Sequence, residues 1–273
     1  MRSWQWSLSY ARMIKNMFRG HDLWNSPWGA IAVLALPVLL VRIIQLGLSD
    51  VWLGLFELVF SIVVLLYCLR YQPQDAWIDE ISNAIEEGEQ QRYQELAEKI
   101  MGKPVDSEVD LIKQVSDAQL VNANERLFAP ALWFALLGPM GAVLYRISWH
   151  YSHSTEEDIN SGGFADAMQR LYAILNWLPA RLLVVGYAIV GSFEDVVHQW
   201  RDVYNHGIDD IEELSQAVLL QGGQAALHVE RYSDSESGGY DVSAIKATRG
   251  LVLRTILAWG IVIAVITLAG WAS

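Results

Sequence analysis

The stretch from Leu175 to Val196, LNWLPARLLVVGYAIVGSFEDV, is an apolar run that indicates a membrane helix and yet contains an arginine. Arg181 stands one turn inside the run, two residues after Pro179. A simple membrane span keeps its charges at the ends, and a soluble helix separates an apolar face from a polar one. This run follows neither pattern, so Arg181 requires a specific explanation.

The composition of the 273-residue chain is that of a membrane protein with acidic aqueous segments. Hydrophobic residues make up 53% of the chain, which has 12 tryptophans and a net charge of −12, and the mean hydropathy is +0.22. This acidity argues against nucleic acid as a partner, because phosphates require Lys and Arg. The single cysteine, Cys68, excludes an intrachain disulfide, and we interpret it as a small buried hydrophobe.

Four apolar runs approach the roughly 20 residues that a helix needs to cross a bilayer. They are 28–48, 51–69, 127–145 and 251–271. A fifth run, 178–193, is shorter and is predicted to be either a short crossing or a surface helix. The predicted fold class is therefore all-α: one polytopic integral membrane domain over 1–273, with four membrane helices, or five if 178–193 crosses.

Two polar and acidic segments, 72–126 and 194–249, are predicted to be helical loops outside the bilayer. In the first, apolar residues recur near helical spacing and glutamates surround Gly88, which favours an amphipathic helical hairpin. A further helix is expected to begin at Ser107 as its N-cap. Basic residues before the first run favour a cytoplasmic N-terminus, which would make 72–126 cytoplasmic.

The first two runs are joined so closely that they must form a helical hairpin. Arg42 and Glu57 lie about seven residues before and after the turn, so both lie roughly 10 Å from the same bilayer face. An unpaired charge at that depth costs several kcal/mol, so we predict that Arg42 and Glu57 pair. The alternative is that each side chain reaches the interface independently.

The third run contains Gly138-Pro139, which predicts a kink or break, because proline removes a backbone hydrogen bond. Broken helices often line binding sites in membrane proteins. The alternative is a simple kink that packs against neighbouring helices through Gly138 and Gly141.

No motif in the chain predicts a metal or a cofactor. His150, His153 and Glu156 fall at a generic spacing and are interpreted as solvated residues at the interface. The group of His206, Asp209 and Asp210 is interpreted in the same way. The glycine-rich phosphate loops and the nucleophile elbow are absent from the sequence.

Two segments together resemble the AmpE family: ANERLFAPALWFALLGPMGAVLYR, residues 123–146, and LNWLPARLLVVGYAIVG, residues 175–191. The resemblance implies a bacterial multi-pass inner-membrane protein linked to β-lactamase induction. It also implies a relation to the CobD/CbiB membrane enzymes of cobalamin synthesis, which join a carboxylate to an amine.

The resemblance also implies a polar ligand site at the membrane boundary. Val121, Tyr172 and Ala173 stand where the cobalamin enzymes carry acids, and such acids would hold a cation for phosphate-coupled ligation. This departure favours a protein without that catalytic activity. The ligand-binding residues that the resemblance implies are Asn122, Glu125, Arg126, Tyr145, Arg146, Asn176 and Arg181.

Arg181 therefore has two interpretations: a site arginine that faces an anionic ligand, or a side chain that anchors to lipid phosphate.

The leading functional hypothesis is a non-catalytic sensor or modulator of peptidoglycan recycling and β-lactamase induction. In this hypothesis the protein lies in the lipid bilayer and binds an anionic ligand, either derived from the cell wall or a nucleotide. The alternative is an active membrane ligase, in which Glu125 with Asp117, or Asp166, would supply the carboxylates. A transporter is a weaker third hypothesis.

Overall fold

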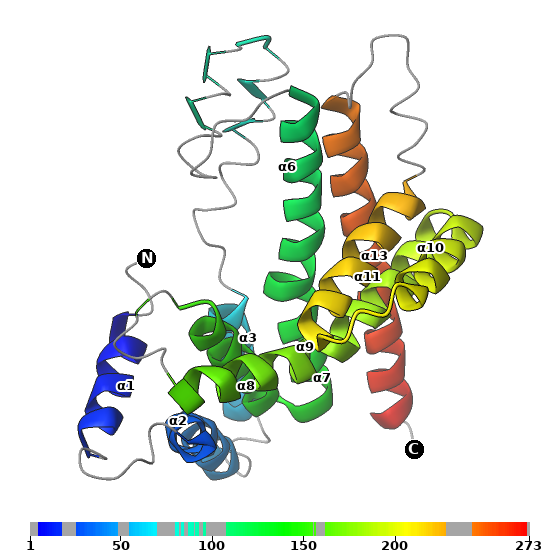
Figure 1. The fold of residues 1–273 in the computed structure, drawn as a ribbon. Coiled ribbons are helices and arrows are strands. Elements are labelled where there is room, and N and C mark those ends of the chain that lie inside the picture. Colours follow the sequence, from blue (N-terminus) through cyan, green and yellow to red (C-terminus); the bar gives the residue numbers. More distant parts are fainter. Residues whose placement is uncertain are drawn as a thin grey trace. The chain divides into compact units, whose positions relative to one another are not determined.

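The computed structural model describes residues 5–17, 26–48, 55–69, 108–154, 156, 162–227 and 242–271, with short pieces between 80 and 96. Every regular element within these ranges is helical, so the predicted all-α class is confirmed (Figure 1). The described residues divide into two compact units. The first comes from Met1–Arg70 and Ala129–Trp177, and the second from Tyr71–Phe128 and Leu178–Ser273.

In the first unit, parts of four helices meet in an apolar core. The elements of this unit are α1 (Gln5–Met17), α2 (Pro27–Leu48), α3 (Leu55–Cys68), α7 (Ala129–Leu137), α8 (Pro139–Ser152) and the beginning of α9 (Gly162–Val190). Ala11 and Ile14 of α1, Val33 of α2 and Ile147 of α8 meet in this core, and Phe164 of α9 completes it. The predicted burial of Cys68, at the end of α3, is confirmed.

The second unit is built on long helices that lie side by side. Its elements are α6 (Glu108–Asn122), η4 (Ala123–Phe128), the end of α9, α10 (Phe193–Asn205), α11 (Ile211–Ala226) and α13 (Val242–Trp271). Helix α6 contacts both α13 and α11, and α10 pairs with α11. The contact between α6 and α11 is close because Gly223 leaves room for Leu120, whose Cδ1 lies 2.6 Å from where a Cβ would stand.

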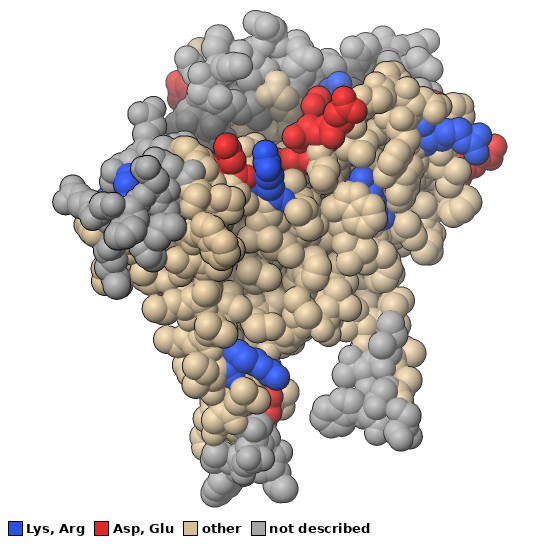
Figure 2. Space-filling view, turned by 60° about the horizontal axis from the view of Figure 1, so that its bottom comes forward, with Lys and Arg blue, Asp and Glu red and all other residues tan. Residues whose placement is uncertain are grey.

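Three of the described helices are long and apolar enough to cross a membrane, namely Pro27–Leu48, Gly162–Val190 and Ser243–Val265, and Leu55–Cys68 is a shorter apolar helix. Large apolar side chains remain exposed on them, such as Ile43 at 68% and Leu257 at 66%. Figure 2 shows one face on which charged side chains gather in a few places between broad areas of other residues. Exposed apolar surface of this extent is typical of helices that face lipid.

The third apolar run forms two helices, α7 and α8, instead of one. The break falls at Gly138, which has a φ of 69°, and Pro139 follows as the first residue of α8. The kink that Gly138-Pro139 predicts is therefore present. The two helices then pack on each other so closely that a Cβ on Gly141 would meet the backbone carbonyl oxygen of Trp133. That run 127–145 crosses a membrane stays a prediction.

Two boundaries differ from the sequence-based expectations. The short run 178–193 belongs to the 29-residue helix α9, which begins at Gly162, well before the predicted start of the run. This helix ends at Val190, and Phe193 begins α10. Its first turns are polar in sequence, yet Phe164 and Met168 are fully buried, so tertiary packing stabilises them as helix.

The expected helical hairpin in 72–126 is described only in part. Residues 80–84 and 91–96 include helical positions on either side of a turn at Glu87 and Gly88, and Gly88 has a φ of 71°. The helix expected to begin at Ser107 is α6, which begins at Glu108. Ser107 itself lies outside the described residues.

The expected direct pairing of Arg42 with Glu57 is wrong in detail, because a third side chain joins them. Arg42 Nη1 donates to Gln45 Oε1 at 3.1 Å, and Gln45 Nε2 donates to Glu57 Oε1 at 2.9 Å. One amide has both a donor and an acceptor, so it can satisfy both charged groups. The hairpin charges are therefore linked, but through a neutral bridge.

Candidate functional site

Of the predicted site residues, Tyr145 and Asn176 are brought into direct contact in the first unit. Tyr145 Oη, on α8, donates to Asn176 Oδ1, on α9, at 3.1 Å, and both side chains are buried. The ring of Tyr172 lies 6.1 Å from that of Tyr145. Because a buried amide and hydroxyl satisfy each other here, this contact fixes α8 against α9.

Arg146 lies beside Tyr145 on α8 and is also buried, at 2% exposed. Its Cζ lies 4.5 Å from the ring centroid of Trp149, one turn further along the same helix. A guanidinium over an indole face is stabilised by the ring quadrupole, more strongly where water is excluded. The sequence predicted Arg146 as a site residue but did not predict this aromatic partner.

In the second unit, Asn122, Glu125 and Arg126 occupy the end of α6 and the π-helix η4. Glu125 is 5% exposed, whereas Asn122 and Arg126 are half-buried. The neighbouring Asn124 is fully buried and was not predicted. π-Helical turns are rare and occur frequently at functional sites, since the extra residue in the turn redirects side chains.

Arg181 is held by two hydroxyl groups within the second unit. Its Nε donates to Tyr204 Oη, on α10, at 3.0 Å, and its Nη1 donates to Ser215 Oγ, on α11, at 3.1 Å. The side chain is 7% exposed, which does not fit an arginine that extends to lipid headgroups. The guanidinium is instead a buried charge that donates hydrogen bonds to two hydroxyl groups.

The carboxylates proposed for the ligase alternative do not form a cluster. Asp117 on α6 accepts a hydrogen bond from Gln224 Nε2 at 2.5 Å, and burial raises the pKa of its carboxyl group, against the smaller lowering effect of that hydrogen bond. Asp166 is exposed and belongs to the first unit. Within the described ranges, no group of three or more His, Cys, Asp or Glu residues is placed to hold a metal ion.

The predicted site residues therefore fall into two sets. Tyr145, Arg146 and Asn176 belong to the first unit, and Asn122, Glu125, Arg126 and Arg181 belong to the second. The sequence missed Tyr204 and Ser215, the partners of Arg181, because they lie 23 and 34 residues away on separate helices. A helical pattern identifies the buried face of a helix but not the residues that face it.

The arrangement defines a class: an all-α membrane protein with buried polar side chains on helices interrupted by proline and by a π-turn. The chain belongs to the AmpE family. Its residues 6–272 match the family model described as "Regulatory signalling modulator protein AmpE". No solved structure matches the chain.

Two curated relatives have the name "Cobalamin biosynthesis protein CobD". The protein of Stutzerimonas stutzeri is 29% identical over 143 residues, which are 48% of this chain and 46% of the relative. The protein of Chromobacterium violaceum is 27% identical over 157 residues, which are 55% of this chain and 49% of the relative. The chain thus spans about half the length of the curated relatives that it matches.

Proposed function

We propose that this protein is a non-catalytic sensor or modulator in the bacterial inner membrane that links peptidoglycan recycling to β-lactamase induction. The description of its family as a regulatory signalling modulator supports the regulatory role. The observation that carries the proposed ligand class is Arg181, a buried guanidinium held by the neutral hydroxyls of Tyr204 and Ser215. The ligand that we propose is anionic, either derived from the cell wall or a nucleotide.

The surroundings of Arg181 suggest how an anion would bind. Ser215 is fully buried and its hydroxyl also donates to the carbonyl of Ile211 at 2.7 Å, so it holds one side of the guanidinium in place. Tyr204 is 46% exposed. An anion can replace the tyrosine oxygen while Ser215 keeps the arginine in position, because a hydrogen bond between two opposite charges is stronger than one from the guanidinium to a neutral hydroxyl.

The test is complementation of a strain that lacks the gene. Wild type, R181Q, R181K and the control R201Q, which changes an exposed arginine of α10, are expressed at matched membrane levels. β-Lactamase activity is then measured with and without an inducing β-lactam. We expect wild type and R201Q to restore the response and R181Q to lose it, with R181K between them. An unchanged response and unchanged muropeptide pools on deletion would contradict the proposal.

The alternative is a membrane ligase that joins a carboxylate and an amine. The names of the two relatives favour it. It predicts turnover by the purified protein that depends on ATP and Mg²⁺ and that E125Q abolishes. Failure of the purified protein to bind nucleotide would argue against the ligase.

A further inference from the structure

The first unit contains an apolar cavity of about 380 Å³ that the proposed function does not use. Four helices line it, through Tyr10 of α1, Pro37 and Val41 of α2, Val64 and Cys68 of α3, and Val143 of α8. Its walls are aliphatic and aromatic surfaces, and its volume lies within the range of small-molecule sites. An apolar cavity of this kind does not hold ordered water, because water needs polar partners.

The lining of the cavity includes both buried and exposed side chains. Cys68 and Ile147 are 1% and 3% exposed, whereas Leu40 and Val63 are 49% and 58% exposed. Because α2 and α3 also expose other large apolar side chains, the exposure of Leu40 and Val63 places the mouth of the cavity on this apolar surface. A molecule that enters sideways from a hydrocarbon layer would reach Cys68 without passing a polar group of the lining.

Pro37 of α2 frees a backbone carbonyl that holds one side chain of the cavity wall in place. Pro37 lacks a backbone N–H, so the carbonyl of Val33, four residues earlier, has no partner within the helix. Tyr10 Oη donates to this carbonyl at 3.3 Å, and the ring of Tyr10 forms part of the cavity wall. The same contact fixes α1 beside the cavity.

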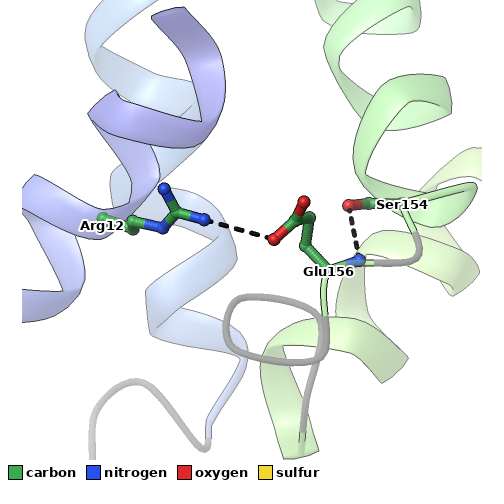
Figure 3. Close-up of polar contacts among 3 residues, drawn as sticks. All are labelled: Arg12, Ser154 and Glu156. Atoms are coloured by element: carbon green, nitrogen blue, oxygen red, sulfur yellow. Dashed lines mark hydrogen bonds and ion pairs between the residues drawn. The ribbon is translucent and has the colours of Figure 1, made fainter. Parts of the chain in front are cut away.

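Helix α1, which contributes Tyr10 to the cavity wall, also carries basic residues. Its polar face presents Ser9, Arg12 and Asn16, and its sequence, QWSLSYARMIKNM, contains two basic residues and no acid. Arg12 Nη2 lies 3.2 Å from Glu156 Oε2, and both side chains are 47% exposed (Figure 3). Such a surface pair contributes little stability, so the guanidinium can exchange its partner for a phosphate. A basic amphipathic helix of this kind lies at the surface of an anionic membrane.

From these features we propose that the cavity binds one acyl chain of an anionic membrane phospholipid, whose headgroup lies at the polar face of α1. The apolar walls and the lipid-facing mouth select the chain, and the excess of basic residues on α1 selects the headgroup. Such a lipid would join α1, α2, α3 and α8, since each of these helices contributes to the cavity wall.

The test uses the full chain in phosphatidylcholine vesicles that contain a trace of photoactivatable phospholipid with a diazirine near the end of one acyl chain. The probe has either a phosphatidylglycerol or a phosphatidylcholine headgroup, and labelled peptides are identified by mass spectrometry. We expect the phosphatidylglycerol probe to label the segments around Pro37 and Val143 severalfold more than the phosphatidylcholine probe does. Equal labelling by both probes, or labelling spread evenly over α2 and α3, would overturn the proposal.

Three variants separate chain binding from headgroup binding. V143F fills the cavity and should abolish labelling of these segments, whereas the control L58F, at an exposed position of α3 outside the lining, should not. R12Q should remove the preference for phosphatidylglycerol while labelling by the phosphatidylcholine probe stays unchanged. Persistent labelling of folded V143F at the wild-type level would contradict the site.

Cys68 provides a second readout that needs no substitution, because it is the only cysteine and lines the cavity. Alkylation of delipidated protein by a small maleimide should slow severalfold when phosphatidylglycerol is restored, and less when phosphatidylcholine is added. An alkylation rate that does not respond to either lipid would refute the occupancy of the cavity even if V143F failed to fold.

Discussion

The indole Nε1 of Trp133, on α7, donates a hydrogen bond to the carbonyl oxygen of Leu175, on α9, at 2.9 Å. This carbonyl lies four residues before Pro179, which has no N–H to bond it within the helix. In the same way, Tyr10 Oη donates a hydrogen bond to the carbonyl oxygen of Val33, four residues before Pro37. Each proline inside a long apolar helix thus has an aromatic donor from another helix, which a membrane setting requires because no water can replace the lost bond.

The first prediction concerns this contact. W133F should lower the free energy of unfolding by about 1–3 kcal/mol, because a buried carbonyl loses its donor. P179A restores the backbone N–H, so W133F should cost less in a P179A background. Chemical unfolding of the four proteins in detergent micelles measures the coupling. Strictly additive losses of unfolding free energy from W133F and P179A would mean that the indole of Trp133 does not compensate for the missing N–H of Pro179.

Gly186 on α9 allows a close approach of α13. A Cβ at Gly186 would lie 2.5 Å from Thr255 Cγ2 and 2.6 Å from Trp259 Nε1. Trp259 Nε1 also donates to the carbonyl of Leu182 at 3.1 Å, and the substitution would disturb this bond. We expect G186A to lower stability by about 1–3 kcal/mol, as overpacking does.

The matched control for this substitution is G260A on α13, where nothing lies within 4 Å of the added Cβ. Its thermal unfolding temperature should be unchanged or slightly raised, because alanine favours helix over glycine. Equal destabilisation by G186A and G260A would show that packing at Gly186 is not the cause.

Gln45 bridges Arg42 and Glu57, so the stability lost on substituting Gln45 should depend on both charged residues. Q45L removes the donor to Glu57 and the acceptor for Arg42, and should destabilise the α2–α3 hairpin by about 1 kcal/mol, within the range of polar contacts between membrane helices. The same substitution in an R42L/E57L background should cost less, because no charge is then left without its partner. Unfolding of the four variants in micelles tests this difference.

Asp117 predicts a pH dependence of stability. Burial raises the pKa of its carboxyl group above the ordinary value of 3.8, so the folded state binds its proton more tightly than the unfolded state does. Its contribution to stability is therefore present at low pH and is lost as the pH rises from 3.8 through the raised pKa.

D117N should abolish this contribution while keeping an oxygen that accepts the hydrogen bond from Gln224. The measurement is the free energy of unfolding of wild type minus that of D117N across this pH range, and the difference should fall with rising pH. E213Q, at an exposed position of α11, controls for the loss of one negative charge. A flat difference for D117N would contradict the effect of burial.

The sequence by itself determined the all-α membrane class, the apolar helices α2, α3 and α13, the break at Gly138-Pro139 and the burial of Cys68. These features follow from properties of short segments: apolar length, the missing N–H of proline and the absence of charge around one thiol. The resemblance to the AmpE family, which the comparison confirms, rested on two continuous motifs of the same local kind.

Only the tertiary structure decided the partners. It placed Gln45 between Arg42 and Glu57. It also supplied the hydroxyl groups of Tyr204 and Ser215 as acceptors for Arg181, and the indole of Trp133 as a donor to the carbonyl of Leu175. It also formed the π-turn of η4, although that segment has no local signal for the conformation. The physical reason is that a residue's own segment fixes its backbone preference and its need for a hydrogen-bond partner. The identity of that partner depends on which distant helices pack together.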